Sequence, residues 1–330
     1  MKKYNLCIAG ASGLVGSTFL QILEERNFPI ENLKLLASKR SAGKIITFKG
    51  QDYEIEEISE NSFDGYDIAL FSAGGKVSEI YAPIAAAKGL VVIDNSSAWR
   101  EHEEIGLVVP EINLADSTKN KIVANPNCST IQSVLPLYAL QKVFGLEQVT
   151  YTTYQSVSGS GQKGIDDLER TKKGEEPQFY PHNISETCIP EIDVFLENGY
   201  TKEEMKMMNE TRKILHAPNL PVSATCVRVP VANSHAVSVQ VTLSKEFDLS
   251  EIVEVLAKQE GIIVLDEGIN HIYPTSTVSR GRDEVFVGRI RRDLSRENSL
   301  LFYCVADNIR KGAALNAVQI AEKMIEENLI

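Results

Sequence analysis

One cysteine stands in an unusual setting. Cys128 lies in the run Asn125-Pro126-Asn127-Cys128-Ser129-Thr130, between the short apolar stretch 122–124 and the helical pattern of 131–143. Because Asn-Pro ends a strand, Cys128 is predicted to lie where a strand turns into a helix. Backbone N–H groups and the helix dipole stabilise a thiolate there. Cys128 is therefore a candidate nucleophile, although most such cysteines are small buried hydrophobes.

A glycine-rich turn near the N-terminus predicts a nucleotide site. The apolar stretch 4–9 runs into Gly10-Ala11-Ser12-Gly13-Leu14-Val15-Gly16, and a helical pattern follows. Strand, glycine turn and helix form the context of a dinucleotide fingerprint, here spaced G-x-x-G-x-x-G. Gly10 permits the tight turn, Gly13 lets a pyrophosphate approach, and Gly16 lets the helix pack closely. We expect cofactor contacts from Gly10, Ser12, Gly13, Leu14 and Val15.

The loop after the second predicted strand indicates which cofactor is bound. Residues 33–37 are followed by Ser38-Lys39-Arg40-Ser41. An NAD site places an acidic residue here, on the ribose 2′-hydroxyl. Hydroxyls and cations suit a 2′-phosphate instead, so we predict NADP, with Ser38, Arg40 and Ser41 as contacts. The alternative is a solvated basic loop.

Composition narrows the classes of protein. The 330 residues carry a net charge of −11, which argues against nucleic acid as a partner. No apolar stretch is long enough to span a membrane, and a cleaved signal peptide is not expected. The five cysteines are scattered without C-x-x-C spacing, so neither a disulfide framework nor a metal site is indicated. We expect a cytoplasmic protein.

The pattern changes near the middle of the chain. Up to residue 127, strands and helices alternate, which predicts a Rossmann-type doubly wound parallel sheet. Polar loops such as Ser72-Ala73-Gly74 follow its strands, where ligands gather. From residue 149, strand patterns with few crossovers predict an α+β domain with a mainly antiparallel sheet. The apolar face of 308–328 predicts a helix that returns to the first domain. The predicted domains are 1–127 with 308–330, and 128–307.

Several further motifs, taken together, resemble the aspartate-semialdehyde dehydrogenase family. The resemblance covers essentially the whole chain. Its motifs are Gly10–Gly16, Ser96-Ser97-Ala98-Trp99-Arg100, Asn125–Thr130, Gln155-Ser156-Val157-Ser158-Gly159, Glu210-Thr211-Arg212-Lys213, Arg228-Val229-Pro230-Val231, Ser234-His235 and Asp307-Asn308-Ile309-Arg310-Lys311-Gly312.

The resemblance implies roles for the reacting groups. Cys128 would form a thioester with the acyl group, and Asn127 would shape its turn. Gln155 would orient the substrate, and His235, titrating near neutral pH, would act as acid and base. Considered without the resemblance, Gln155 is a strand residue satisfying its neighbours, and His235 a core histidine.

The resemblance also implies binding roles. Arg228 would grip the substrate carboxylate, as a cation in an apolar strand needs an anionic partner. Glu210 would meet the substrate ammonium, and Lys213 and Arg100 the phosphate. Glu210 and Lys213 also fit an ordinary surface ion pair. Ser158, Gly159 and Asn308 would complete the cofactor site.

These roles imply NADPH-dependent reduction of L-aspartyl 4-phosphate to L-aspartate 4-semialdehyde, in biosynthesis of the aspartate family of amino acids. The partners would be small molecules and a second copy, in a homodimer or a dimer of dimers. Two alternatives remain. One is an N-acetyl-γ-glutamyl-phosphate reductase, whose cysteine frame is Asn-Pro-Gly-Cys. The other is a non-catalytic NADP sensor, which has no reason to keep Cys128, Gln155, Arg228 and His235 together.

Overall fold

The computed structural model describes residues 2–330, which form two compact units. Unit 1 comprises Met1–Pro126 and Ala313–Ile330, and unit 2 comprises Asn127–Gly312. The predicted division differs by one residue at the first boundary and five at the second. Residues 308–312 stay with unit 2, where the Asn308 side chain accepts hydrogen bonds from the hydroxyls of Ser156 and Ser158.

Unit 1 contains a seven-stranded sheet in the order β3-β4-β2-β1-β5-β6-β7. All neighbours are parallel except the β3–β4 hairpin, which the sequence analysis did not predict. The strands are β1 (Tyr4–Ala9), β2 (Ile30–Ala37), β3 (Ile45–Phe48), β4 (Gln51–Glu57), β5 (Ile68–Phe71), β6 (Val91–Asp94) and β7 (Ile122–Ala124). The predicted doubly wound parallel sheet is confirmed.

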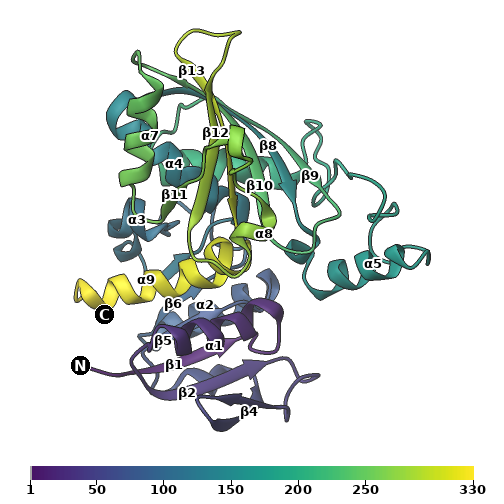
Figure 1. The fold of residues 1–330 in the computed structure, drawn as a ribbon. Coiled ribbons are helices and arrows are strands. Elements are labelled where there is room, and N and C mark those ends of the chain that lie inside the picture. Colours follow the sequence, from purple (N-terminus) through teal and green to yellow (C-terminus); the bar gives the residue numbers. More distant parts are fainter. Residues whose placement is uncertain (1) are drawn as a thin grey trace. The chain divides into compact units, whose positions relative to one another are not determined.

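Helices cover both faces of this sheet (Figure 1). The apolar faces of α1 (Leu14–Glu25) and α9 (Leu315–Glu326) share one core with alternate residues of the strands. On the opposite face, Phe71 stacks on Phe63, which also contacts Tyr81 of α2 (Gly75–Ala87). The C-terminal helix therefore packs on the first domain, as predicted. Short segments are α3 (Pro110–Asn113) and the 3₁₀ turns Glu60–Phe63 and Leu114–Thr118.

Unit 2 contains a six-stranded sheet in the order β11-β12-β13-β10-β8-β9. The outer pairs β8–β9 and β11–β12 are parallel and the others antiparallel, which confirms a mainly antiparallel sheet. The strands are β8 (Leu146–Gln155), β9 (Val222–Arg228), β10 (His235–Leu243), β11 (Ile262–Val264), β12 (Val285–Arg292) and β13 (Ser299–Ala306).

Three helices pack on one face of this sheet: α4 (Cys128–Phe144), α6 (Lys202–Ile214) and α7 (Leu249–Lys258). Two more are α5 (Gln162–Lys172) and α8 (Ser276–Ser279), with 3₁₀ turns at Val157–Ser160 and Gly268–Asn270. Residues 177–190 form a loop without a helix or a strand. The last predicted helix is interrupted, because Arg310–Ala314 forms a π-helical turn before α9.

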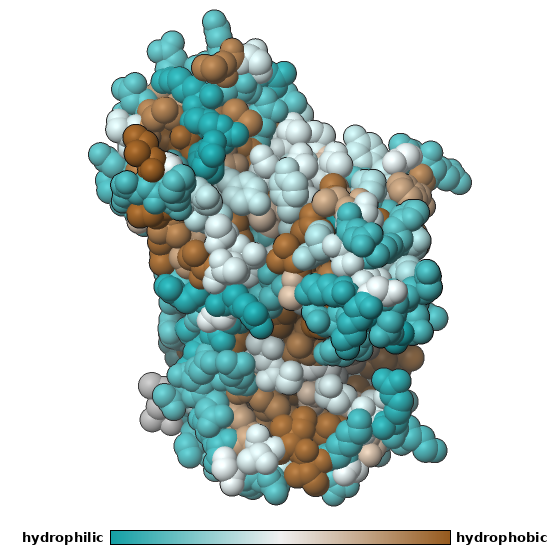
Figure 2. All heavy atoms as spheres, turned by 45° about the vertical axis from the view of Figure 1, so that its right-hand side comes forward, coloured by the Kyte–Doolittle hydropathy of each residue, from teal (hydrophilic) through white to brown (hydrophobic). Residues whose placement is uncertain are grey.

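The surface of the chain mixes hydrophilic side chains with scattered large apolar ones, as one face in Figure 2 shows. Tyr154, on β8, is 39% exposed, and its ring lies tilted against that of Tyr303 on β13, with 6.2 Å between the ring centroids. Within residues 2–330, no helix has both the length and the apolar character needed to cross a membrane.

Candidate active site

The N-terminus of α4 holds the candidate nucleophile. Asn127 is the N-cap, and its side-chain oxygen accepts hydrogen bonds from the backbone N–H groups of Ser129 and Thr130. The helix thus begins at Cys128, three residues earlier than the pattern predicted, because the cap and not the first apolar residue defines its start. Cys128 lies in its first turn, as its candidate role requires.

Cys128 differs from the buried cysteines. Burial raises the pKa of Cys7 and Cys304 to about 12, and also raises that of Cys226, so these thiols stay protonated. Cys128 is partly exposed. Gly312 lies against it, since a Cβ atom at Gly312 would come within 2.9 Å of the Cys128 Cβ. A larger residue at position 312 would therefore clash with Cys128.

The topology of unit 2 explains how three other site residues come together. β8 and β9 are parallel, so Gln155 and Arg228 are paired where both strands end. β10 is antiparallel to β8, so its first residue, His235, lies at the same end of the sheet. Arg228 and His235 follow Gln155 by 73 and 80 positions in the sequence, so local patterns do not predict that they meet; the strand register brings them together.

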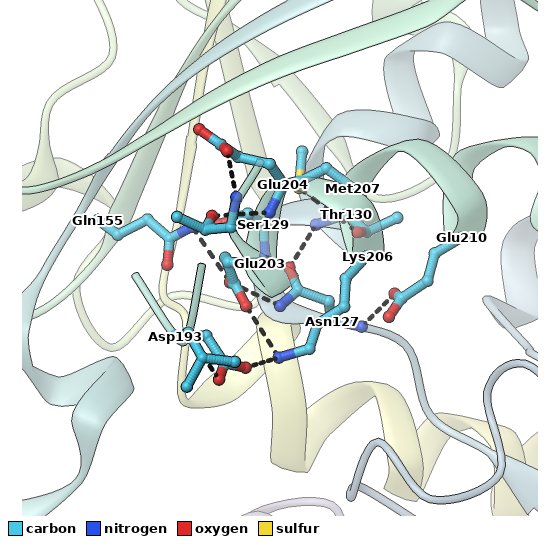
Figure 3. Close-up of polar contacts among 12 residues, drawn as sticks. Asn127, Ser129, Thr130, Gln155, Asp193, Glu203, Glu204, Lys206, Met207 and Glu210 are labelled. Atoms are coloured by element: carbon cyan, nitrogen blue, oxygen red, sulfur yellow. Dashed lines mark hydrogen bonds and ion pairs between the residues drawn. The ribbon is translucent and has the colours of Figure 1, made fainter. Parts of the chain in front are cut away.

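Buried polar side chains surround the α4 N-terminus (Figure 3). The backbone N–H of Asn127 donates to Glu210 Oε2 at 2.6 Å, and the Asn127 side chain donates to Glu203 Oε1 at 2.8 Å. Gln155 also donates to Glu203, at 3.2 Å. Glu210 is only 1% exposed. It is therefore no surface ion-pair residue, whereas Lys213, on the same helix, is half-buried.

His235 is fully buried, and its ring nitrogens have different surroundings. The Ser156 backbone N–H donates to Nδ1 at 3.0 Å, whereas Nε2 has no hydrogen-bond partner among residues 2–330. Burial, followed by the charge of Arg228, lowers the pKa of His235 well below its usual range, and both outweigh the opposing effect of the Ser234 backbone. The near-neutral titration expected from the sequence is therefore not found. The ring is neutral, with its hydrogen on Nε2.

Arg228 is 5% exposed, and its guanidinium donates to the Ser156 carbonyl at 2.6 Å. Its Nε is buried without a hydrogen-bond partner among the described residues. A Cβ atom at Gly159 would lie 3.0 Å from Arg228 Nη1 and 3.1 Å from His235 Nε2. Glycine at position 159 therefore keeps a side chain away from the guanidinium of Arg228 and from Nε2 of His235.

Asn308 and Ser158 belong to one buried network. Asn308 Oδ1 accepts hydrogen bonds from the Ser234 backbone N–H and from the Ser156 hydroxyl, and Asn308 Nδ2 donates to Ser158 Oγ. This network holds the segment that contains Gly159 and Ser156, and the backbone N–H of Ser156 donates to His235. Both predicted cofactor residues are thus already bonded within unit 2.

In unit 1, the glycine turn has the predicted form. Gly10 has φ +90°, and a Cβ there would lie 2.3 Å from the Ser72 carbonyl oxygen. A Cβ at Gly16 would lie 2.2 Å from the Gly10 carbonyl oxygen, so the helix packs as closely as predicted. Gly13 is exposed as the N-cap of α1, a position that favours phosphate.

Most of the other candidate residues of unit 1 border this turn. Ser12 Oγ donates to Ser41 Oγ at 3.1 Å, which joins the turn to the loop after β2, where Ser38 and Arg40 are exposed. Ser72, through its contact with Gly10, borders the turn, and Ala73 and Gly74 follow it. Arg100 is buried and donates to the Asn95 carbonyl.

Two residues of the site were not assigned from the sequence: Glu203 and Ser156. Thr201 and Glu204 form a capping box, a readable signal that places the neighbouring Glu203 in the first turn of α6. No sequence signal indicates that Glu203 reaches Asn127 and Gln155. Among residues 2–330, no cluster of three or more His, Cys, Asp or Glu side chains could hold a metal ion.

Comparisons with known proteins show to which family the chain is similar. Residues 5–120 match the model of the semialdehyde dehydrogenase NAD-binding domain, and residues 135–311 match that of the semialdehyde dehydrogenase dimerisation domain. The chain is 53% identical to the aspartate-semialdehyde dehydrogenase of Aquifex aeolicus, with 99% of each chain covered. It is 46% identical to that of Bacillus subtilis, at the same coverage.

The chain belongs to the aspartate-semialdehyde dehydrogenase family. A solved structure of aspartate semialdehyde dehydrogenase II from Vibrio cholerae, described as complexed with ASA, is 44% identical, with a TM-score of 0.95 and 99% of each chain covered. Membership of the aspartate-semialdehyde dehydrogenase family makes this chain an oxidoreductase with a nicotinamide-cofactor domain, a small-molecule substrate and a dimerisation domain. It also favours the semialdehyde dehydrogenase activity over both alternatives.

Proposed function

We propose that this chain reduces L-aspartyl 4-phosphate to L-aspartate 4-semialdehyde with NADPH, through a thioester on Cys128. The observation that carries the residue assignment is the meeting of Gln155, Arg228 and His235 at one end of the unit 2 sheet, in the unit where α4 begins at Cys128. The Cys128 thiolate attacks the acyl carbon, and the acyl–phosphate bond breaks. The leaving phosphate takes up one proton.

The remaining steps use the same groups. A bound nicotinamide supplies the hydride that reduces the thioester carbonyl. His235 Nε2–H, beside Arg228, stabilises the resulting oxyanion, which narrows the acid/base role expected from the sequence. The oxyanion then forms the aldehyde carbonyl and expels the Cys128 thiolate, a step that needs no proton. Each turnover regenerates the thiolate.

Charged side chains divide the substrate between them. Arg228 holds the carboxylate through its planar guanidinium, and Glu210 meets the ammonium. Lys213 and Arg100 hold the phosphate, which explains how a chain with a net charge of −11 binds an acyl phosphate. The glycine turn of unit 1 fits a dinucleotide, because Gly13 is exposed at the N-cap of α1, while Gly10 and Gly16 let the turn and helix pack closely.

Three finer features belong to this proposal. NADP is preferred, because the loop after β2 carries Ser38, Arg40 and Ser41 and no acidic residue. The assembly is a homodimer or a dimer of dimers, formed through unit 2. The protein is cytoplasmic, because the scattered cysteines form no disulfide among the described residues.

The deciding experiment measures NADPH formation from aspartate semialdehyde, phosphate and NADP. N-acetylglutamate semialdehyde serves as the comparison substrate. We expect phosphate-dependent turnover of aspartate semialdehyde and no turnover of N-acetylglutamate semialdehyde. Turnover of the acetylated substrate, or turnover that does not require phosphate, would contradict the proposal.

A further inference from the structure

Glu203 is a buried carboxylate to which the proposed reaction gives no role. It lies in the first turn of α6 and is 5% exposed. Burial alone would raise the pKa of Glu203, but the charge of Lys206 and hydrogen bonds from Asn127, Lys206 and Gln155 outweigh it and hold the pKa below its usual range. Glu203 is thus a charged group at neutral pH, and a buried charge needs fixed partners.

Those partners hold both carboxylate oxygens (Figure 3). Glu203 Oε1 accepts from Asn127 Nδ2 at 2.8 Å and from Gln155 Nε2 at 3.2 Å. Glu203 Oε2 accepts from Lys206 Nζ at 3.2 Å, and Lys206 also donates to Asp193 at 2.8 Å. Asn127 and Lys206 therefore fix the carboxylate, which is then a rigid acceptor for Gln155.

This arrangement determines which end of the Gln155 amide is available. An amide nitrogen has two hydrogens. One points to Glu203 Oε1 and the other to Thr153 Oγ1, at 3.4 Å. A flipped amide would place its oxygen against the carboxylate, acceptor against acceptor. Gln155 can therefore offer a ligand only its carbonyl oxygen.

We propose that Glu203 is a positioning residue that fixes the Gln155 amide, so that Gln155 accepts a hydrogen bond from the substrate ammonium. This inference rests on the proposed function. Of the hydrogen-bonding groups on aspartate semialdehyde at neutral pH, the carboxylate and the aldehyde oxygen only accept, and the ammonium alone donates. The reacting oxygen becomes negative and needs donors, which Gln155 does not supply. Gln155 thus discriminates for the amino group of the substrate.

The test compares two semialdehydes in two neighbouring variants. Succinic semialdehyde has the same four-carbon chain without the ammonium. E203Q removes the negative charge. Its amide nitrogen, a donor, would face either the donors of Asn127 and Gln155 or the ammonium of Lys206. E204Q is the matched control, because Glu204 is also buried but accepts from the backbone N–H groups of Thr201 and Cys226.

We expect E203Q to lower kcat/KM for aspartate semialdehyde about 10- to 100-fold, the size of a small misplacement of a binding group. For succinic semialdehyde the loss should stay within about threefold, because Gln155 has no donor to meet there. E204Q should leave the preference between the two substrates unchanged. Equal losses for both substrates in E203Q, or an unchanged preference, would overturn the inference.

A second variant keeps the inference testable if E203Q folds poorly. Q155L removes the acceptor and keeps the shape, and should narrow the substrate preference as E203Q does. In the Q155L background, a further E203Q or E203D change should alter that preference by less than about threefold. Undiminished loss in that background would show that Glu203 does not act through Gln155. Wild-type protein without phosphate-dependent turnover would count against the proposed function instead.

Discussion

The two units hold their candidate ligand groups in opposite ways. In unit 1 the turn between β1 and α1 consists of backbone and missing side chains, and Arg40 beside it is exposed. In unit 2 the groups are charged or polar side chains with little or no exposure, among them Glu203, Arg228 and His235. The first site should fail when atoms are added, and the second when a charge or a donor is removed.

The largest expected effect is at Cys128. C128A should abolish turnover, at least about 10⁴-fold, while NADP binding persists, because the covalent step is in unit 2 and the glycine turn is in unit 1. C128S should retain a trace, since a hydroxyl is a weaker nucleophile. The measurements are steady-state kinetics and fluorescence titration with NADPH. Substantial aspartyl phosphate reduction by C128A would exclude the thioester mechanism.

Next in size is the loss of the guanidinium fork at Arg228. R228K keeps the charge but not two parallel N–H donors, and should cost about 2–4 kcal/mol in transition-state stabilisation. The Michaelis constant for phosphate should hardly change, because phosphate is assigned to Lys213 and Arg100. K213A should show the reverse pattern. Saturation curves against semialdehyde and against phosphate test both variants. If R228K weakens the binding of phosphate as much as that of semialdehyde, the assignment of separate carboxylate and phosphate sites is wrong.

Unit 1 should respond to added atoms. G16A places a Cβ only 2.2 Å from the Gly10 carbonyl oxygen, and should lower the unfolding free energy by about 3 kcal/mol. G13A is the matched control, since its Cβ would meet nothing nearer than 3.4 Å, and should cost about 1 kcal/mol or less. Urea unfolding measures both. Similar losses for the two variants would contradict the close packing at Gly16.

The geometry of the unit 1 turn can be predicted from the sequence more fully than that of the unit 2 site. The turn is local: strand, glycines and helix are consecutive, so their spacing predicts the geometry. The unit 2 site is not local, since Glu203 meets Asn127 and Gln155 at sequence separations of 76 and 48. The chemistry of Cys128 was partly predictable from its helix, but the roles of Arg228 and His235 came from family resemblance. The β3–β4 hairpin was missed because its strands are polar and partly exposed.

A smaller effect is expected at the tautomer of His235. S156P removes the N–H that bonds Nδ1, and the Ser156 φ of −68° suits proline. S156A is the comparison variant, because it keeps that N–H and removes only the hydroxyl, whose oxygen also lies 3.0 Å from Nδ1. We expect S156P to lower kcat by about 10-fold or more and S156A less, since a misdirected Nε2–H loses its bond to the oxyanion. Imidazole ¹⁵N shifts should show hydrogen on Nε2 in wild type and S156A; hydrogen on Nδ1 would contradict the assignment.

The depressed pKa of His235 adds a pH test. The unfolded chain binds a proton at this histidine below about pH 6.5, whereas the folded chain does not until a much lower pH. Its contribution to stability therefore falls as pH drops below about 6.5. H235Q, which does not titrate, should show a smaller loss of unfolding free energy between pH 7 and 5, each value taken at about constant salt. An equal slope in both proteins would mean that His235 titrates normally.

The smallest effect is expected at Arg40, on the exposed side of unit 1. R40A removes one cation from a loop that also carries Lys39 and two hydroxyls, so the remaining groups still attract a 2′-phosphate. An exposed charge-assisted contact should contribute about 1 kcal/mol, close to a fivefold rise in the Michaelis constant for NADP. The constant for NAD should stay nearly the same, because NAD has no 2′-phosphate to lose. K39A removes the other cation of this loop and keeps both hydroxyls, so it shows whether Lys39 and Arg40 contribute equally to NADP binding. Because screening weakens exposed contacts, the difference between R40A and wild type should shrink as salt is raised. Equal rises for NADP and NAD would mean that Arg40 supports the loop and does not read the 2′-phosphate.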